Sequence, residues 1–337
     1  MAEGAGESAR SERPQGSPWS DWLVAQAPVL SIAGFFALMA LVFAATADAF
    51  TSQLNILNLL RQSAPLIIVA VAMTFVITTG GIDLSVGSIV ALVNALAAIA
   101  LQAQVPWPLV VPMMLLLGAL VGAVQGWFIA WQGIPAFIVT LAGLSVLRGV
   151  ALLITEGYSI PIDPKSWFVQ IGRGWVFGVP LPAVIAVVVA FLGWVTLTQT
   201  RFGRHVTAIG ANAEATRRSG VNVRRATASV YVLSGMAAAL AGIIIAARLG
   251  SGSSNAAVAF ELEAIAAVVL GGTALMGGRG TVVGTLLGAA TMAVIGNGLI
   301  LSHVSPFFTQ IVTGLIILLA IWINTRFFAR LGQGRSK

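Results

Sequence analysis

The chain has 337 residues, of which 58% are hydrophobic and only 9% charged, and its mean hydropathy is +0.96. A soluble domain has about a quarter of its residues charged, so this composition excludes an ordinary soluble protein and favours lipid as the solvent. The net charge of +7 comes from basic residues in loops between apolar segments, which indicates membrane topology and not a nucleic-acid partner.

The N-terminal residues 1–24 are polar and of mixed charge, which predicts a disordered tail. Spanning a bilayer takes about 20 apolar residues, so residues 27–47 predict the first membrane helix. Residues 54–62 form an amphipathic stretch, with leucines on one face and Arg61 on the other. Its length predicts a helix that lies in the membrane interface.

The remaining apolar segments are interrupted by glycine and proline, and they predict nine more membrane helices. These are expected at residues 63–79, 84–102, 106–131, 136–154, 181–198, 228–247, 262–276, 281–301 and 307–324. The predicted fold is therefore an all-α integral membrane protein of about ten helices, with a transmembrane domain over residues 25–325.

Basic residues orient the predicted helices. Residues 199–227 contain six arginines against one acid, and the tail at 326–337 has four basic residues and no acid. By the positive-inside rule, both segments are expected in the cytoplasm, together with the N-terminus. The loops at 102–106, 155–180 and 248–261 are then expected outside a multi-pass protein.

The sequence lacks several kinds of chemical site. It has no cysteine and two histidines, so no disulfide and no metal site are expected. Lys165 is the only lysine before the last residue and follows Pro164, which excludes a P-loop ATPase site. An ion-coupled carrier should have several ionisable groups inside its helices.

Such ionisable groups are few. The candidates lie near predicted helix ends or breaks, where capping or snorkelling explains them: Asp83, Arg148, Glu261 and Glu263. This pattern favours a chain driven by a partner. A standalone secondary carrier or channel, and an intramembrane enzyme, remain open alternatives.

A glycine pattern occurs twice. Gly80–Gly81 followed by Gly87–Ser88 matches Gly277–Gly278 followed by Gly284–Thr285 at the same spacing. Transporters often contain internal repeats. With 37 glycines in the chain, a chance match is an equally open reading.

The first of these segments contains the acid Asp83 at the start of a predicted helix. One interpretation is a structural cap, in which the carboxylate accepts backbone N–H bonds at the positive end of the helix dipole. The other is that Gly81, Asp83 and Ser85 shape a gate or the pathway, because non-helical backbone at membrane depth must be covered by protein or line a cavity.

Sparse polar residues on otherwise apolar helices are further candidates for the pathway. They are Thr74, Asn94, Thr140 and Asn297. Each is equally a candidate for a helix–helix contact in lipid.

Four stretches together resemble the ribose/xylose/arabinose-type permeases of ABC transporters. They extend over Thr78–Ser88, Pro135–Gly149, Thr200–Val223 and Glu261–Gly298, and the similarity covers residues 50–325. The first includes GGIDLSVGS. Branched-chain amino-acid permeases are more distantly similar, and they supply the alternative substrate.

The resemblance implies a type II importer of a monosaccharide in a bacterial inner membrane. A second permease copy would complete the pathway, and a heterodimer with a sister permease is the alternative. A cytoplasmic ABC ATPase would bind ATP and Mg, so this chain would bind no cofactor. A periplasmic sugar-binding protein would deliver the substrate.

Within this scheme, residues 199–227 are the candidate for coupling to the ATPase. A short helix is expected at 213–220, with Asn212 as its cap and Gly220 at its end. The candidate polar contacts are Arg204, Glu214, Arg217 and Arg218. A solvated basic loop is the alternative. On the outside, Arg173 and Arg248 are candidates for docking the binding protein, or for simple snorkelling.

Overall fold

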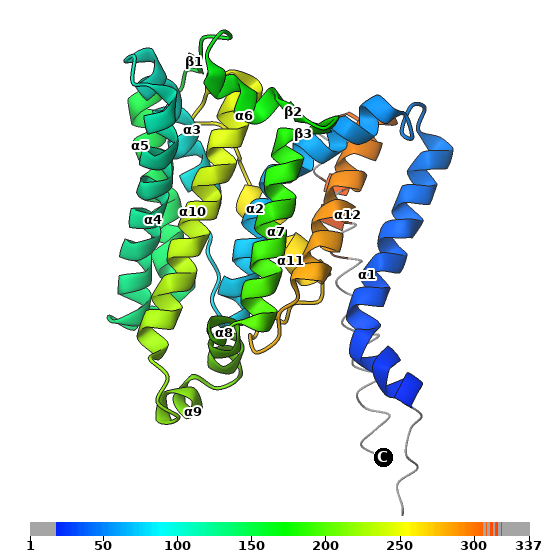
Figure 1. Ribbon diagram of the computed structural model, residues 1–337, viewed down its shortest axis with the longest axis vertical. Helices are drawn as coiled ribbons and strands as arrows, with labels where there is room; N and C mark the ends of the chain where they lie inside the picture. The colour runs from blue at the N-terminus through cyan, green and yellow to red at the C-terminus, as the bar shows by residue number, and fades with distance from the viewer. Residues whose placement is uncertain (1–17, 306–307, 309–310, 313, 316–317, 319–337) are drawn as a thin grey trace, which may run out of the picture.

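The computed structural model describes residues 18–305 and, beyond them, residues 308, 311–312, 314–315 and 318. The helix expected at 307–324 and the tail at 326–337 therefore lie mostly or entirely outside the described residues. Long helices run side by side between two ends of the molecule (Figure 1). We call the end formed by residues 199–222 the basic end and the opposite end, which contains short strands, the strand end.

Among the described residues, seven helices are long and apolar enough to cross a membrane. They are α1 (Pro18–Thr46), α2 (Gln53–Thr78), α4 (Trp107–Ala130), α5 (Ala136–Thr155), α7 (Leu181–Gln199), α10 (Val223–Leu249) and α12 (Val282–Leu301). The prediction of an all-α membrane protein is confirmed at this level.

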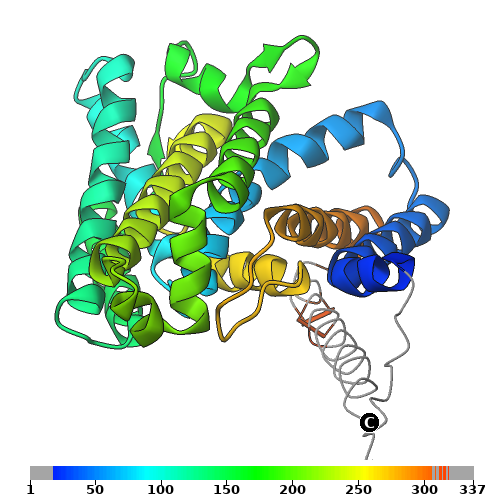
Figure 2. The ribbon, with the colours of Figure 1, turned by 60° about the horizontal axis from the view of Figure 1, so that its bottom comes forward.

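Two further apolar helices are shorter. α3 (Val86–Gln102) has 17 residues, and α11 (Phe260–Leu270) has 11. At 1.5 Å per residue, α11 is about 16 Å long, roughly half the thickness of the hydrocarbon core. It lies beside α12 and α2 (Figure 2).

Short elements close the two ends of the bundle. α8 (Arg201–Ala211) and α9 (Ala213–Arg218) form the basic end, while η1 (Trp167–Val169) and α6 (Gln170–Arg173) lie at the strand end. Two antiparallel ribbons join β1 (Ile160–Pro161) to β4 (Ser251–Gly252) and β2 (Trp175–Val176) to β3 (Val179–Pro180).

Three expected boundaries were wrong. The amphipathic stretch at 54–62 is not a separate interfacial helix but the first part of α2, which continues through Pro65. A proline is tolerated there because its missing N–H removes only one hydrogen bond from a long, packed helix. In the same turn, the Ser63 hydroxyl donates to the Leu60 carbonyl. α1 begins at Pro18, inside the segment predicted to be a disordered tail.

The third correction concerns the helix expected at 262–276, which ends at Leu270. Gly271 packs against the backbone of Gly284 in α12, and Gly272 has a positive φ of 89°. A left-handed glycine stops a helix without steric cost. Residues 271–281 are therefore non-helical.

Glycines bring α4 and α10 into close contact. Gly118 of α4 faces the carbonyl of Gly235 in α10, and Gly235 in turn faces the carbonyl of Gly118. One turn along, Gly122 lies against the backbone of Tyr231. Small residues spaced by four allow membrane helices to approach backbone to backbone.

We expect Gly122→Leu to destabilise the protein strongly. Its Cβ would collide with the Tyr231 carbonyl and the Val232 Cα, which belong to the backbone and cannot rotate away. Overpacking costs about 1–3 kcal/mol, and a rigid backbone contact lies at the upper end. Thermal unfolding in detergent measures the loss. Gly34→Leu is the control, since a Cβ there meets no atom within 4 Å in the part of the chain that the structure describes. Equal melting temperatures in the two variants would contradict the packing argument.

The two glycine segments singled out by their repeated spacing lie against each other. Gly80 follows α2 and Gly277 precedes α12, both with a φ of 83°. The N–H of Gly278 donates to the Thr78 carbonyl at 3.0 Å. The breaks between α2 and α3 and between α11 and α12 therefore meet at the basic end.

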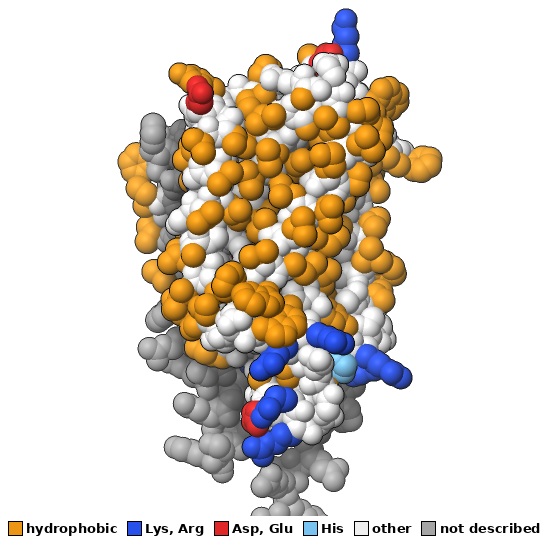
Figure 3. Space-filling model, turned by 90° about the vertical axis from the view of Figure 1, so that its left-hand side faces the viewer, with side chains coloured by type: hydrophobic (Ala, Val, Ile, Leu, Met, Phe, Trp, Pro, Cys, Tyr) orange, Lys and Arg blue, Asp and Glu red, His pale blue; other side chains and the backbone are white. Residues whose placement is uncertain are grey.

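Figure 3 shows one face of the molecule, on which a broad band of hydrophobic side chains separates the two ends. Lysine and arginine side chains gather below this band, at the basic end. Exposed apolar residues of α4, α5 and α7, such as Leu116, Leu153 and Val187, are typical of a lipid-facing surface.

Candidate functional site

The break between α2 and α3 is organised around a buried carboxylate, Asp83, which is 0% exposed. Its Oδ1 accepts a hydrogen bond from the backbone N–H of Ser85 at 2.9 Å and another from the Ser85 hydroxyl at 2.6 Å. Its Oδ2 accepts from the hydroxyl of Ser234 in α10 at 2.6 Å. The expected backbone contact at the start of α3 is confirmed, and Ser234 adds a tie to α10.

Two side chains that the sequence did not single out complete this cluster. Gln125 of α4 donates from Nε2 to the Ser85 hydroxyl at 2.9 Å. Tyr231 of α10 is 1% exposed, lies against Gly81, and has a hydroxyl without a hydrogen-bond partner among the described residues. The structure thus brings the three gate candidates together with α4 and α10. The sequence signal that could have identified Gln125 and Tyr231 was the position of a polar side chain inside an apolar helix.

Thr140 lies close to this cluster, and Thr74 lies on the neighbouring helix. The Thr140 hydroxyl donates to the Ile82 carbonyl at 3.1 Å, so α5 also holds the break. The hydroxyls of Thr74 and Thr285 are 2.7 Å apart and join α2 to α12. Both threonines are 0% exposed and already have partners within the chain.

The two asparagines lie elsewhere. Asn94 of α3 is buried, and its Oδ1 accepts from the backbone N–H of Ser253 at 2.6 Å. Asn297 of α12 pairs with Asn55 of α2 through two amide hydrogen bonds of 2.9 and 3.0 Å. Asn55 is 23 residues before Thr78, about 34 Å along α2, so this pair is far from the break.

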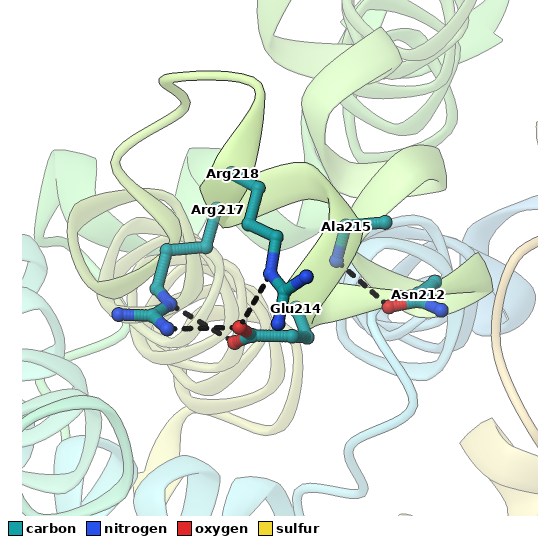
Figure 4. Close-up of polar contacts among 5 residues, drawn as sticks. All are labelled: Asn212, Glu214, Ala215, Arg217 and Arg218. Carbon is teal, nitrogen blue, oxygen red and sulfur yellow. Dashed lines mark hydrogen bonds and ion pairs between the residues drawn. The ribbon is translucent and has the colours of Figure 1, made fainter.

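At the basic end, α9 has the expected local structure (Figure 4). The Asn212 side chain caps the helix by accepting from the backbone N–H of Ala215 at 2.9 Å. Glu214 lies in the first turn and bonds to both Arg217, at 2.9 and 3.0 Å, and Arg218, at 3.0 Å. Gly220, with a φ of 87°, follows the end of the helix.

These contacts lower the pKa of the Glu214 carboxyl below its ordinary value, because hydrogen bonds from Arg217 and then Arg218 stabilise the carboxylate. A lowered pKa means that the contacts contribute to stability above the ordinary pKa and are lost as the pH falls through the lowered one. At neutral pH the cluster is therefore intact. Arg204, on α8, is exposed at the same end.

α8 was not predicted, and it connects the basic end to the helix breaks. Gly210, near its C-terminus, packs directly against the Thr78 carbonyl and the Gly278 N–H. Gly277 also lies next to Gly210. The signal in the sequence was a glycine close to the end of an amphipathic segment, but its partners are distant in the chain.

At the strand end, Arg173 and Arg248 lie together, as the Arg173 Nε donates to the Arg248 carbonyl at 2.9 Å. Arg61 of α2 joins them; its guanidinium lies 4.7 Å from the ring centre of Trp175. Buried nitrogens of Arg61 and Arg248 have no hydrogen-bond partner in the described part of the chain. We call Arg61, Arg173 and Arg248 the arginine trio. Arg61 was expected only as the polar side of an interfacial helix.

Comparison with known proteins gives the family. The sequence profile of the family described as "Branched-chain amino acid transport system / permease component" matches residues 55–321. The ribose import permease protein RbsC of Haemophilus influenzae is 43% identical over 287 residues, covering 84% of this chain and 88% of the relative.

Two relatives from Escherichia coli K12 are also similar over most of their length. The ribose import permease protein RbsC is 42% identical over 90% of this chain and 95% of its own, and the xylose transport system permease protein XylH is 36% identical over 87% and 90%. No solved structure matches the chain. The profile match and these identities show that the chain belongs to this family of transport-system permeases.

Proposed function

We propose that the chain is the membrane-spanning permease subunit of an ATP-driven importer for a monosaccharide. The observation that carries this proposal is the similarity to ribose import permeases over 84–90% of the chain. Since the description of the matching family names branched-chain amino acid transport, another small solute such as a branched-chain amino acid is the alternative substrate. A standalone secondary carrier is the alternative mechanism.

The proposed arrangement has about ten crossings in a type II permease fold, with both termini in the cytoplasm of a bacterium. In this proposal α3 and α11 count as crossings that include non-helical backbone, and the last crossing is the one that the sequence predicts at residues 307–324. The arginines of the basic end support a cytoplasmic location for α8 and α9, by the positive-inside rule. The strand end then faces the periplasm.

Transport needs three partners in this scheme: a second permease copy, which makes a homodimer, a cytoplasmic ATPase that binds ATP and Mg, and a periplasmic sugar-binding protein. α9 is the proposed contact with the ATPase, because its exposed Glu214–Arg217–Arg218 cluster projects from the basic end. Arg173 and Arg248 are the proposed contact with the binding protein, because Arg173 is exposed at the strand end and guanidinium groups suit carboxylates. Residues around Asp83 form the proposed gate.

We expect Glu214→Lys or Arg218→Glu to abolish stimulation of ATP hydrolysis by the loaded binding protein, while membrane insertion is normal. The lysine would set three positive charges within one turn of α9, and the glutamate would leave two carboxylates facing each other. The measurement is ATPase activity of the reconstituted complex, with and without the binding protein.

The matched control combines Glu214→Arg with Arg218→Glu, which reverses the intrahelical ion pair. If the cluster contacts the ATPase, the reversed pair stays inactive, because the pattern presented to the partner is wrong. Normal coupling in the single variants would remove α9 from this role. Recovery in the reversed pair would show that the cluster only stabilises α9.

Reconstitution tests the function as a whole. The chain is placed in proteoliposomes with an ABC ATPase and a sugar-binding protein encoded next to it, and uptake of labelled ribose, xylose and leucine is measured. ATP-dependent uptake of a sugar is the expected result. Uptake of leucine alone would favour the alternative substrate, and uptake without ATP would overturn the importer.

A further inference from the structure

Arg148 lies inside the membrane-spanning part of α5. It is 12 residues after Ala136 and 7 before Thr155, or about 18 Å and about 10 Å from the two ends of the helix. The sequence suggested that such a residue snorkels to the surface. Instead its guanidinium turns inward to the chain, where Nη1 donates to the carbonyls of Ser254 and Ala256 at 2.6 and 2.8 Å.

These carbonyls belong to a non-helical segment, residues 253–259, that descends beside α3. The segment begins at Ser253, bonded to Asn94, and reaches the level of Gly87, which lies against the Ala257 carbonyl. Ala257 and Ala259 have positive φ values of 56° and 62°. Backbone of this kind is tolerated at membrane depth only where protein covers it or where it lines a water-filled cavity.

The segment leads into the first turn of α11, where Glu261 meets the first turn of α3. The Glu261 carboxylate lies against Gly87, which is 15 residues, or about 22 Å, from the end of α3. Its Oε2 is buried and has no hydrogen-bond partner within the described ranges. Glu261 and Arg148 attract each other electrostatically but do not form an ion pair among the described residues.

Accessible polar groups continue this surface. Asn255 is exposed and lies between two residues whose carbonyls Arg148 binds, and Ser145 is exposed on α5 one turn before Arg148. We call Ser145, Arg148, Asn255 and Glu261 the polar strip. Charged side chains within a membrane span almost always face a bundle interior or a water-filled cavity, because hydrocarbon cannot solvate them.

We propose that the polar strip is a wall of the translocation pathway, where it hydrogen-bonds the hydroxyl groups of a neutral, polyhydroxylated solute; this inference rests on the proposed transport function. A carboxylate, a guanidinium, an amide and a hydroxyl supply both acceptors and donors, as neighbouring hydroxyls on a sugar require. With one acid and one base, the strip has no net charge, which suits a neutral solute.

A hollow elsewhere in the described structure suits a sugar less well. It has a volume of about 620 Å³, lies between α4 and α5, and is lined by apolar side chains apart from Gln125. Such a lining leaves most sugar hydroxyls without partners. The strip is therefore the better wall for a polar solute.

The experiment uses the absence of cysteine from the chain, so each introduced cysteine is unique. Ser145→Cys and Asn255→Cys are reconstituted with the ATPase and binding protein and treated with a membrane-impermeant thiol reagent. Val187→Cys is the matched control, because Val187 is 68% exposed on the apolar surface of α7. Because only the thiolate reacts, and it forms in water, we expect the strip cysteines to react roughly tenfold faster than the control.

Transported sugar should also slow the labelling of these cysteines during turnover. Labelling no faster than that of Val187→Cys, or labelling unaffected by sugar, would each overturn the inference. A wild-type complex without sugar uptake would instead refute the proposed function, so the two failures are distinguishable.

Discussion

Gly210→Val is expected to abolish ATP-driven uptake. A Cβ at position 210 would overlap the Thr78 carbonyl and the Gly278 backbone nitrogen, so α8 could not stay seated on the two helix breaks. α8 and α9 form the basic end, where we propose that the ATPase binds, and Thr78 leads directly into the Asp83 break. The junction at Gly210 therefore connects the proposed ATPase contact directly to the proposed gate.

The measurement separates loss of coupling from loss of folding. Gly296→Val is the control, because no atom of the described residues lies within 4 Å of a Cβ at position 296 in α12. Yield and elution in size-exclusion chromatography report folding, and basal and stimulated ATP hydrolysis report coupling. If Gly210→Val folds and its ATPase is still stimulated as in the control, α8 does not transmit motion to the breaks.

Asp83→Leu should have the second large effect. The substitution removes the acceptor of three hydrogen bonds. It leaves the buried Ser234 hydroxyl and the Ser85 backbone N–H without an acceptor, while the Ser85 hydroxyl keeps its contact with Gln125. Hydrogen bonds to a charged group contribute about 1.5–3 kcal/mol each, and a buried polar group left unpaired costs about 1–3 kcal/mol. We therefore expect a loss of about 3 kcal/mol or more in stability, together with loss of uptake.

Asp83→Asn is the matched control for this prediction. Its side-chain oxygen can still accept from Ser85, and its amide can donate to the Ser234 hydroxyl, so the local geometry is retained. In thermal unfolding, the melting temperatures of the wild type and of Asp83→Asn should both be higher than that of Asp83→Leu. If Asn and Leu lower the melting temperature equally, the charge of Asp83 matters more than its hydrogen bonds, and the capping argument is wrong.

Local features of the site followed from local sequence. The α9 helix was predicted between residues 213 and 220, and it extends over Ala213–Arg218 with Asn212 as its cap, because capping depends only on the nearest few residues. The backbone contact of Asp83 with Ser85 followed in the same way. Its bond to Ser234 could not be predicted, since the two residues are 151 positions apart.

The same distinction explains the incorrect boundaries. The apolar run at 262–276 has the composition of a membrane helix, yet α11 ends at Leu270 because Gly271 packs on Gly284. The stretch at 54–62 has the polarity of an interfacial helix, yet it continues into α2 because the following residues from Ser63 onward are buried against other helices. Packing decided both cases, and hydropathy along the chain does not report packing.

By itself, the sequence determined that this protein crosses the membrane several times. It has apolar segments of spanning length and few charges, which suit lipid as the solvent, and its basic segment at 199–227 indicates the orientation. Only the tertiary structure decided which polar groups act together. Arg148 with the 253–259 segment, Gly210 with Thr78 and Gly278, and Arg61 with the other arginines each join positions far apart in the chain. Their proximity depends on how helices pack, and no periodicity within one helix encodes it.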